Sequence, residues 1–198
     1  GLRNFAHQIS NQVYQQLTGV KGVFTTKIAY ILVQHSPGKP VVYSLEVADQ
    51  DGFNPHPVLR SYQPIMSPTW SPSGQQLAYV SFENNRSAIY LQDLSSGKRR
   101  MLSEYPGING APAFSPDGKK LALVLTRSGN PKLYMMTIAT GQLQELTFGS
   151  SIDTEPSWSA NGQSIIFTSN RGGGPQIYQY SLLNKQVQRL TFEGNYNA

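Results

Sequence analysis

The sequence contains no cysteine, few charged side chains and no long apolar run. Charged residues make up 14% of the 198 residues, against about 25% in an average domain. The absence of cysteine excludes disulfides, thiolate metal sites and cysteine nucleophiles. The longest apolar runs, such as Leu121–Leu125, are far shorter than the roughly 20 residues that cross a bilayer. No membrane insertion is therefore expected.

The residues that are present favour a turn-rich β protein. Gly occurs 18 times and Pro 13 times, while 38% of residues are hydrophobic and 11% aromatic. That apolar content can bury a core, so disorder is not expected. With so few charges, the surface must consist largely of Ser, Thr, Asn and Gln. The length allows one domain or two small ones.

The net charge of +5 and the pI near 9.4 raise the question of nucleic acid as a partner. The basic run Lys98–Arg100 and the pair at Lys119 and Lys120 stand alone, and the other basic residues are scattered. A nucleic-acid surface usually concentrates its charge on one face. A solvated strand edge protected by charge explains the run better, so we expect no nucleic-acid partner.

An internal repeat is the main signal. Segments that begin at Pro68, Pro112 and Pro156 superpose without a gap, 44 residues apart. The register holds across many positions of the unit. The matching sets are Trp70, Phe114 and Trp158; Gly74, Gly118 and Gly162; Leu77, Leu121 and Ile165; Tyr90, Tyr134 and Tyr178; and Leu102, Leu146 and Leu190.

Each repeat unit predicts four short strands. In the middle unit these are residues 112–115, 120–126, 132–138 and 143–147, and a Pro-Asp-Gly turn ending at Gly118 joins the first two. Apolar residues occupy both parities of the second strand, so both of its faces are expected to be buried. Four antiparallel strands per unit, buried on both faces in the middle, describe a blade of a β-propeller.

The repeats divide residues 28–198 into four predicted blades. The first, residues 28–67, is degenerate, and the others cover 68–111, 112–155 and 156–198. The predicted fold class is therefore all-β, a partial β-propeller with one N-terminal helix. That helix, residues 1–18, has apolar residues at three- and four-residue steps and a stop signal at Gly19. A linker, 19–27, follows. We expect the apolar face of the helix to pack on the propeller or on another domain.

Few residues suggest catalysis or metal binding. No G-x-S-x-G motif occurs, and the histidines His7, His35 and His56 have no ordered partners by sequence. Residues 49–54 resemble the start of a calcium loop, but an Asp-Gly turn explains them more simply. Asp153 with Glu155 at the propeller axis is a second cation candidate, against the simpler alternative of two solvated acids. We therefore predict no catalytic residue, no metal and no cofactor.

The aromatic series are expected to be structural. Trp70, Phe114 and Trp158 stand on the first strand of successive units, where such side chains wedge between neighbouring blades more often than they stack on a ligand. The same applies to the tyrosine series.

The segments before each first strand are the candidate binding surface. Residues 107–111, 150–155 and 194–198 keep the repeat register but differ in side chain, and in a propeller such loops line one mouth of the central channel. Two alternatives remain open, a binding surface or loops that merely close turns. The candidate partner-binding residues are Asn109, Gly110, Ala111, Asp153, Thr154 and Glu155.

The repeat P-x-[WF]-S-[PA]-x-G-x-x-[LI], followed by [IL]-Y and [ELR]-L-[ST], resembles the WD-like propeller repeat of the TolB family. Residues 17–22, 109–118 and 153–156 also look like that family's own sequence, and the resemblance extends from the helix to Ala198. It implies a non-enzymatic periplasmic protein with a small N-terminal α/β domain and a six-bladed propeller. Residues 1–18 would then be the last helix of the α/β domain. Ile108 departs from the polar residue expected there.

The resemblance also implies partners. The family acts in the Tol-Pal system of outer-membrane integrity and cell division, and its propeller binds the peptidoglycan-associated lipoprotein Pal at the mouth that the six candidate residues would form. Some colicins use an overlapping site, and the N-terminal domain communicates with TolA. The alternative function is the substrate-gating propeller of a prolyl-oligopeptidase-type serine peptidase, in which a G-x-S-x-G-bearing domain would follow residue 198.

Overall fold

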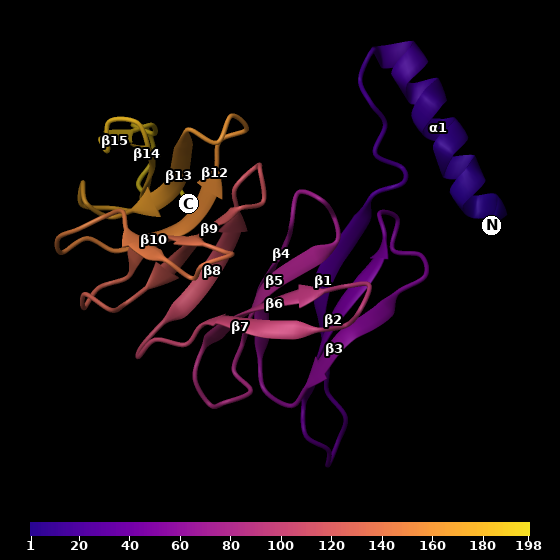
Figure 1. Cartoon of the computed structure of the whole chain (residues 1–198), viewed down its shortest axis with the longest axis horizontal. Coiled ribbons are helices and arrows are strands. Elements are labelled where there is room, and N and C mark those ends of the chain that lie inside the picture. Colours follow the sequence, from indigo (N-terminus) through magenta and orange to yellow (C-terminus); the bar gives the residue numbers. More distant parts are fainter. The chain divides into compact units, whose positions relative to one another are not determined.

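The computed structural model describes all residues from Gly1 to Ala198 and is mostly β, as predicted (Figure 1). It divides into two compact units, Gly1–Arg60 and Ser61–Ala198. The first contains one helix and a three-stranded sheet, and the second contains three four-stranded antiparallel sheets.

In the first unit, helix α1 (Leu2–Thr18) precedes strands β1 (Lys27–Gln34), β2 (Val42–Asp49) and β3 (His56–Ser61), which lie in that order in the sheet. The helix ends where its sequence predicts, because Gly19 adopts a left-handed conformation with φ of 72°. The three strands match residues 27–33, 41–47 and 58–62, which align with the second, third and fourth strands of the later repeat units.

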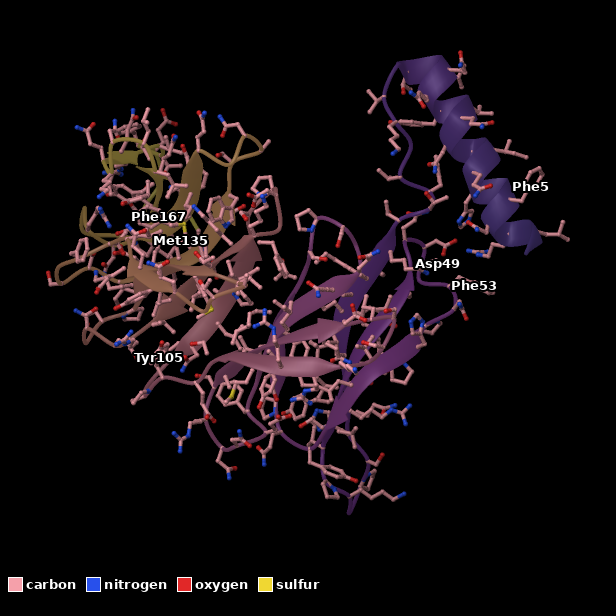
Figure 2. All side chains as sticks on the ribbon, in the orientation of Figure 1. Phe5, Asp49, Phe53, Tyr105, Met135 and Phe167 are labelled. Carbon is pink, nitrogen blue, oxygen red and sulfur yellow. The ribbon has the colours of Figure 1, made fainter.

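Polar contacts hold the helix to the rest of its unit. Asn11 accepts a hydrogen bond from the Phe24 N–H at 2.8 Å, and Arg3 pairs with Asp51 and lies 4.1 Å from the centre of the Phe53 ring. The apolar stripe remains exposed, with Phe5 on the outer side of the helix (Figure 2). Of the two expected partners for this stripe, the sheet of its own unit does not cover it, and packing on another domain stays a prediction.

The second unit consists of three blades, numbered 2 to 4 after the sequence repeats. The strands of each blade pair in chain order. Blade 2 contains β4 (Ile65–Trp70), β5 (Gln76–Ser81), β6 (Ala88–Asp93) and β7 (Arg99–Ser103); blade 3 contains β8 (Asn109–Phe114), β9 (Lys120–Leu125), β10 (Lys132–Thr137) and β11 (Leu143–Glu145); blade 4 contains β12 (Asp153–Trp158), β13 (Ser164–Ser169), β14 (Gln176–Ser181) and β15 (Val187–Arg189).

Blade 3 is buried on both faces, which confirms the parity argument. Leu121, Leu123 and Leu125 pack with residues of blade 2, while Ala122 and Val124 pack with residues of blade 4. Met135 and Phe167 lie in this second contact layer (Figure 2). Because successive side chains of a strand point to opposite faces, one continuous apolar run supplies two interfaces.

Two residues of the first aromatic series, Phe114 and Trp158, pack between blades, as predicted. Trp158 of blade 4 donates its Nε1–H to the Ala113 carbonyl of blade 3 at 3.0 Å, and Phe114 lies in the layer between blades 2 and 3. Tyr90, Tyr134 and Tyr178 are all buried.

The first strands begin earlier than predicted. Asn109–Ala111 and Asp153–Glu155 were expected in loops, but they form the first halves of β8 and β12. The sequence misleads because a proline follows each of these segments and usually marks a strand end. The register shifts between Gly110 and Ala113 and between Thr154 and Ser157, so a β-bulge places each proline where no ladder hydrogen bond is needed.

The two-sided packing predicts a cost for truncation in blade 3. Leu123 is fully buried, and Leu123→Ala should lower the free energy of unfolding by about 2–5 kcal/mol because it leaves a cavity. Leu183→Ala is the control, since Leu183 is 92% exposed and should change stability by about 0.5 kcal/mol or less. Urea denaturation measures both, and equal effects would contradict the packing.

Candidate functional site

The predicted site residues lie at the start of β8 and β12, two strands that adjoin each other in the second unit. Each strand also contains a residue in a left-handed conformation, Ala111 with φ of 45° and Glu155 with φ of 53°, and Ser67 of β4 repeats the feature with φ of 49°. A non-glycine residue pays roughly 1–2 kcal/mol for this conformation. Because the left-handed residue recurs at the same position of β4, β8 and β12, the β-bulge is a repeated feature of the first strands.

Asn109 is fully buried and joins blades 2 and 3. Its Oδ1 accepts hydrogen bonds from the Ser103 hydroxyl at 2.6 Å and the Tyr105 N–H at 2.9 Å. Its Nδ2 donates to the Tyr105 carbonyl at 2.6 Å. The Asn109 N–H donates to the Ser87 hydroxyl at 2.9 Å. The side chain therefore anchors the strand and presents nothing to solvent.

Asp153 occupies the equivalent position in blade 4 and is also fully buried. Its Oδ2 lies 3.1 Å from Nζ of the buried Lys132, which comes from blade 3. Its Oδ1 accepts hydrogen bonds from the Ser169 hydroxyl at 2.6 Å and from Arg171 Nη2 at 3.0 Å. Lys132 also donates to the carbonyl and the hydroxyl of Ser151. One carboxylate thus joins blade 3 to blade 4.

The hydrogen bonds keep this carboxylate charged. Burial alone would raise the pKa of Asp153, but the hydrogen bonds from Ser169, Arg171 and Lys132 outweigh it and lower the pKa below its usual value. The sequence does not pair Asp153 with Lys132, because Lys132 stands 21 residues away on another blade. The one signal is that a lysine begins β10, where the equivalent residues of the neighbouring blades are Ala88 and Gln176.

The four other candidates are accessible. Gly110, Ala111 and Thr154 are partly exposed and Glu155 is exposed. A Cβ at Gly110 would meet only the Ile108 side chain, at 3.7 Å, so the surface there is open. A pocket of about 170 Å³ also lies at the start of β12. Its lining includes Ile152, Thr154, Glu155, Thr168, Asn170 and Tyr196.

Exposed apolar side chains flank the same strands. Ile108 and Ile152 directly precede β8 and β12, and Tyr196 stands at the equivalent place in the next repeat. Their exposed fractions are 50%, 46% and 72%. The 44-residue spacing of these residues is the signal that finds them, although only Ile108 drew attention in the sequence. Apolar exposure beside small residues is typical of a protein-binding surface.

The structure disfavours both cation candidates. The Asp153 oxygens are already occupied by protein donors, so Asp153 and Glu155 are not a pair of solvated acids either. Residues 49–54 form the Asp-Gly turn, with Gly52 at φ of 80° and its N–H bonded to the Asp49 carbonyl at 2.8 Å. No three His, Asp or Glu side chains converge as a metal site would require.

The one helix is too short and too polar to cross a membrane.

The buried pair predicts a pH-dependent loss of stability. Asp153→Asn leaves Lys132 buried without its carboxylate and should lower the free energy of unfolding by about 3–5 kcal/mol at pH 7. The pKa of Asp153 is depressed in the folded state, so the wild-type advantage is present above the unfolded pKa, near about 3.9, and is lost as pH falls through the lower folded value. Urea denaturation from pH 7 to pH 3 measures this. A difference between the two proteins that does not shrink at acid pH would contradict the assignment.

Three comparisons place the chain among known proteins. The sequence profile described as the TolB beta propeller domain matches residues 14–198. The Tol-Pal system protein TolB of Coxiella burnetii is 67% identical over 111 residues, which are 56% of this chain and 25% of that protein. The crystal structure of TolB from Acinetobacter baumannii superposes with a TM-score of 0.92 at 48% identity, covering 99% of this chain and 49% of that one.

More distant structures share only the fold. A puromycin-hydrolyzing peptidase of Mycobacterium tuberculosis matches with a TM-score of 0.63 at 18% identity, over 86% of this chain and 29% of that chain. The chain spans about half the length of the A. baumannii protein, and the curated match covers a quarter of the C. burnetii one. Because the profile covers nearly every residue and the blades repeat its unit, the chain belongs to the TolB β-propeller family.

Proposed function

We propose that this chain is the protein-binding part of a non-enzymatic component of the bacterial Tol-Pal system, and that its first strands bind the lipoprotein Pal. The observation that carries the proposal is the 67% identity to a protein named as TolB of that system. The aligned relatives of Hydrogenovibrio crunogenus and Nitrosococcus oceani carry the same name at 56% and 54% identity.

The geometry of the first strands supports a protein partner. Gly110, Ala111 and Thr154 present small side chains or none, so a partner backbone can approach closely. Ile108 and Ile152 add exposed apolar area beside them. The buried Asn109 and Asp153 fix both strands before a partner arrives, which reduces the entropy cost of binding.

The remaining roles of the system follow from the same proposal. The site of action would be the periplasm, with a role in outer-membrane integrity and cell division, and colicins would compete with Pal for the same surface. Residues 1–18 would be the last helix of an N-terminal α/β domain that communicates with TolA. The exposed apolar stripe of α1 supports this part, because an isolated surface helix rarely leaves such a stripe uncovered.

The peptidase alternative rests on fold alone. The chain is 18% identical in sequence to the M. tuberculosis peptidase. A β-propeller fold can host unrelated functions, so this similarity does not indicate a peptidase. The gating function would require a peptidase domain with its own nucleophile. We therefore favour the binding function.

A bulky side chain at Gly110 tests the proposal. Gly110→Trp adds volume at an open position whose backbone φ is not left-handed, so it should weaken Pal binding at least about tenfold by a steric clash while the melting temperature stays within a few degrees. Isothermal titration calorimetry against purified Pal measures the affinity.

Thr140→Trp is the matched control. Thr140 is exposed in the turn at the opposite end of blade 3, and tryptophan there should leave Pal affinity unchanged. Equal affinity of the Gly110→Trp and wild-type proteins, with both folded, would refute the proposed surface.

A further inference from the structure

Each blade of the second unit carries a buried tyrosine at the same place in its third strand. These residues are Tyr90, Tyr134 and Tyr178, 44 residues apart. Their exposed fractions are 7%, 3% and 5%. The groups around the three hydroxyls differ between blades, and the difference singles out blade 4.

In blade 2 the tyrosine lies beside an internal ion pair. The Glu83 carboxylate lies 2.5 Å from Arg99 Nη2, and the Arg99 guanidinium lies 4.2 Å from the centre of the Tyr90 ring. Burial, reinforced by the interaction with Glu83, raises the pKa of Tyr90. Tyrosine, carboxylate and guanidinium thus form one set of contacts within the blade.

Blade 3 has the same three groups from different positions. Ser128 donates a hydrogen bond to the Glu145 carboxylate at 2.8 Å and lies 3.3 Å from the Tyr134 hydroxyl. Arg127 lines the same pocket, of about 330 Å³. Burial raises the pKa of Tyr134, and Glu145 contributes in the same direction while Ser128 opposes it. A carboxylate again accompanies the tyrosine.

At these two positions blade 4 has arginines instead of a carboxylate. The positions equivalent to Glu83 and Glu145 are Arg171 and Arg189. The Arg171 guanidinium lies 5.2 Å from the centre of the Tyr178 ring. A Cβ at Gly172 would lie 2.8 Å from the Tyr178 hydroxyl and 3.5 Å from Arg189 Nη1, so glycine leaves room for both groups over its backbone. The Tyr178 hydroxyl makes no hydrogen bond to the protein.

The local charge is uncompensated. Arg171 shares the single carboxylate of Asp153 with the buried Lys132. Arg189 forms no ion pair, and its Nε donates to the Thr191 carbonyl at 2.5 Å, which fixes the guanidinium. The Arg171 side chain is 27% exposed, so solvent and ligands reach it. Two cations, Lys132 and Arg171, therefore share one carboxylate, and a third, Arg189, has none.

We propose that Arg171, Tyr178 and Arg189 form a carboxylate-binding site on blade 4. An external carboxylate would lie beside the Tyr178 hydroxyl, as the Glu145 carboxylate lies beside Tyr134 in blade 3, and would accept hydrogen bonds from that hydroxyl and from the Arg189 guanidinium. Guanidinium groups hold carboxylates by paired, charge-assisted hydrogen bonds. The carboxylate comes from a free organic acid or from a Glu or Asp side chain of a peptide, and the site does not depend on Pal binding.

The test is a titration followed by the arginine Nε–Hε signals in NMR spectra of the ¹⁵N-labelled 198-residue chain. Two probes are used at low salt, glutarate and the peptide acetyl-Gly-Glu-Gly-amide, with its Gln counterpart as the neutral control. The Arg189 and Arg171 signals should shift along one saturating curve with glutarate. A saturating response to the Glu peptide but not the Gln peptide identifies a protein side chain as ligand, and a response to glutarate alone identifies a free acid.

Two variants distinguish this site from general attraction to a basic protein. Arg189→Gln should weaken glutarate binding at least about tenfold, whereas Arg127→Gln should leave it unchanged, because blade 3 already holds Glu145 beside that arginine. Shifts that stay linear with both probes, equal weakening by the two variants, or sulfate binding as tightly as glutarate would overturn the proposal.

A charge reversal gives a readout in stability. Arg189→Glu places a carboxylate at the position where blade 3 has one, so it should raise the melting temperature by a few degrees and abolish glutarate binding. An unchanged or lower melting temperature in this variant would contradict the argument that Tyr178 and Arg171 lack a neighbouring carboxylate.

Discussion

The fold of the second unit depends on a buried polar contact at the start of β8 and another at the start of β12. Asn109 bonds to Ser103 of the preceding blade, and Asp153 bonds to Lys132 of the preceding blade. Breaking such a contact leaves a buried polar or charged group without its partner, which costs far more than the contact contributes net. The apolar layers between blades supply most of the stabilisation, but the polar contacts fix where β8 and β12 begin. The open surface at Gly110 and Thr154 follows from that placement.

Successive side chains of β8 and β12 point to opposite faces, so inward and outward residues have different roles. Asn109 and Asp153 point into the blade junctions, while the next residues, Gly110 and Thr154, are partly exposed. Because the inward Asn109 and Asp153 are buried and polar, each needs hydrogen-bond partners from the protein. In β4 the apolar Ile65 is buried at the same position. The outward residue meets no such demand, and its identity varies between repeats. A rigid strand thus presents a variable surface, as a binding site requires.

The sequence alone predicts the periodic features and misses those that depend on distant partners. The repeat register predicts the strands of blades 2 to 4 and the burial of Leu121–Leu125 on both faces, because these follow from local patterns. The starts of β8 and β12 were misplaced because Pro112 and Pro156 conceal a β-bulge. Asp153 reads as a surface acid, since Lys132 and Arg171 approach it only in the folded chain. Its burial is a property of the blade junction and not of its neighbours in sequence.

The most direct test of this account is hydrogen–deuterium exchange of the chain with and without Pal. If the first strands bind the partner, the peptides covering residues 108–112 and 152–156 should exchange more slowly in the complex. The turn at 139–142, at the opposite end of blade 3, should exchange at the same rate in both states. Protection confined to that turn, or no protection at the first strands under saturating Pal, would contradict the assignment of the binding surface.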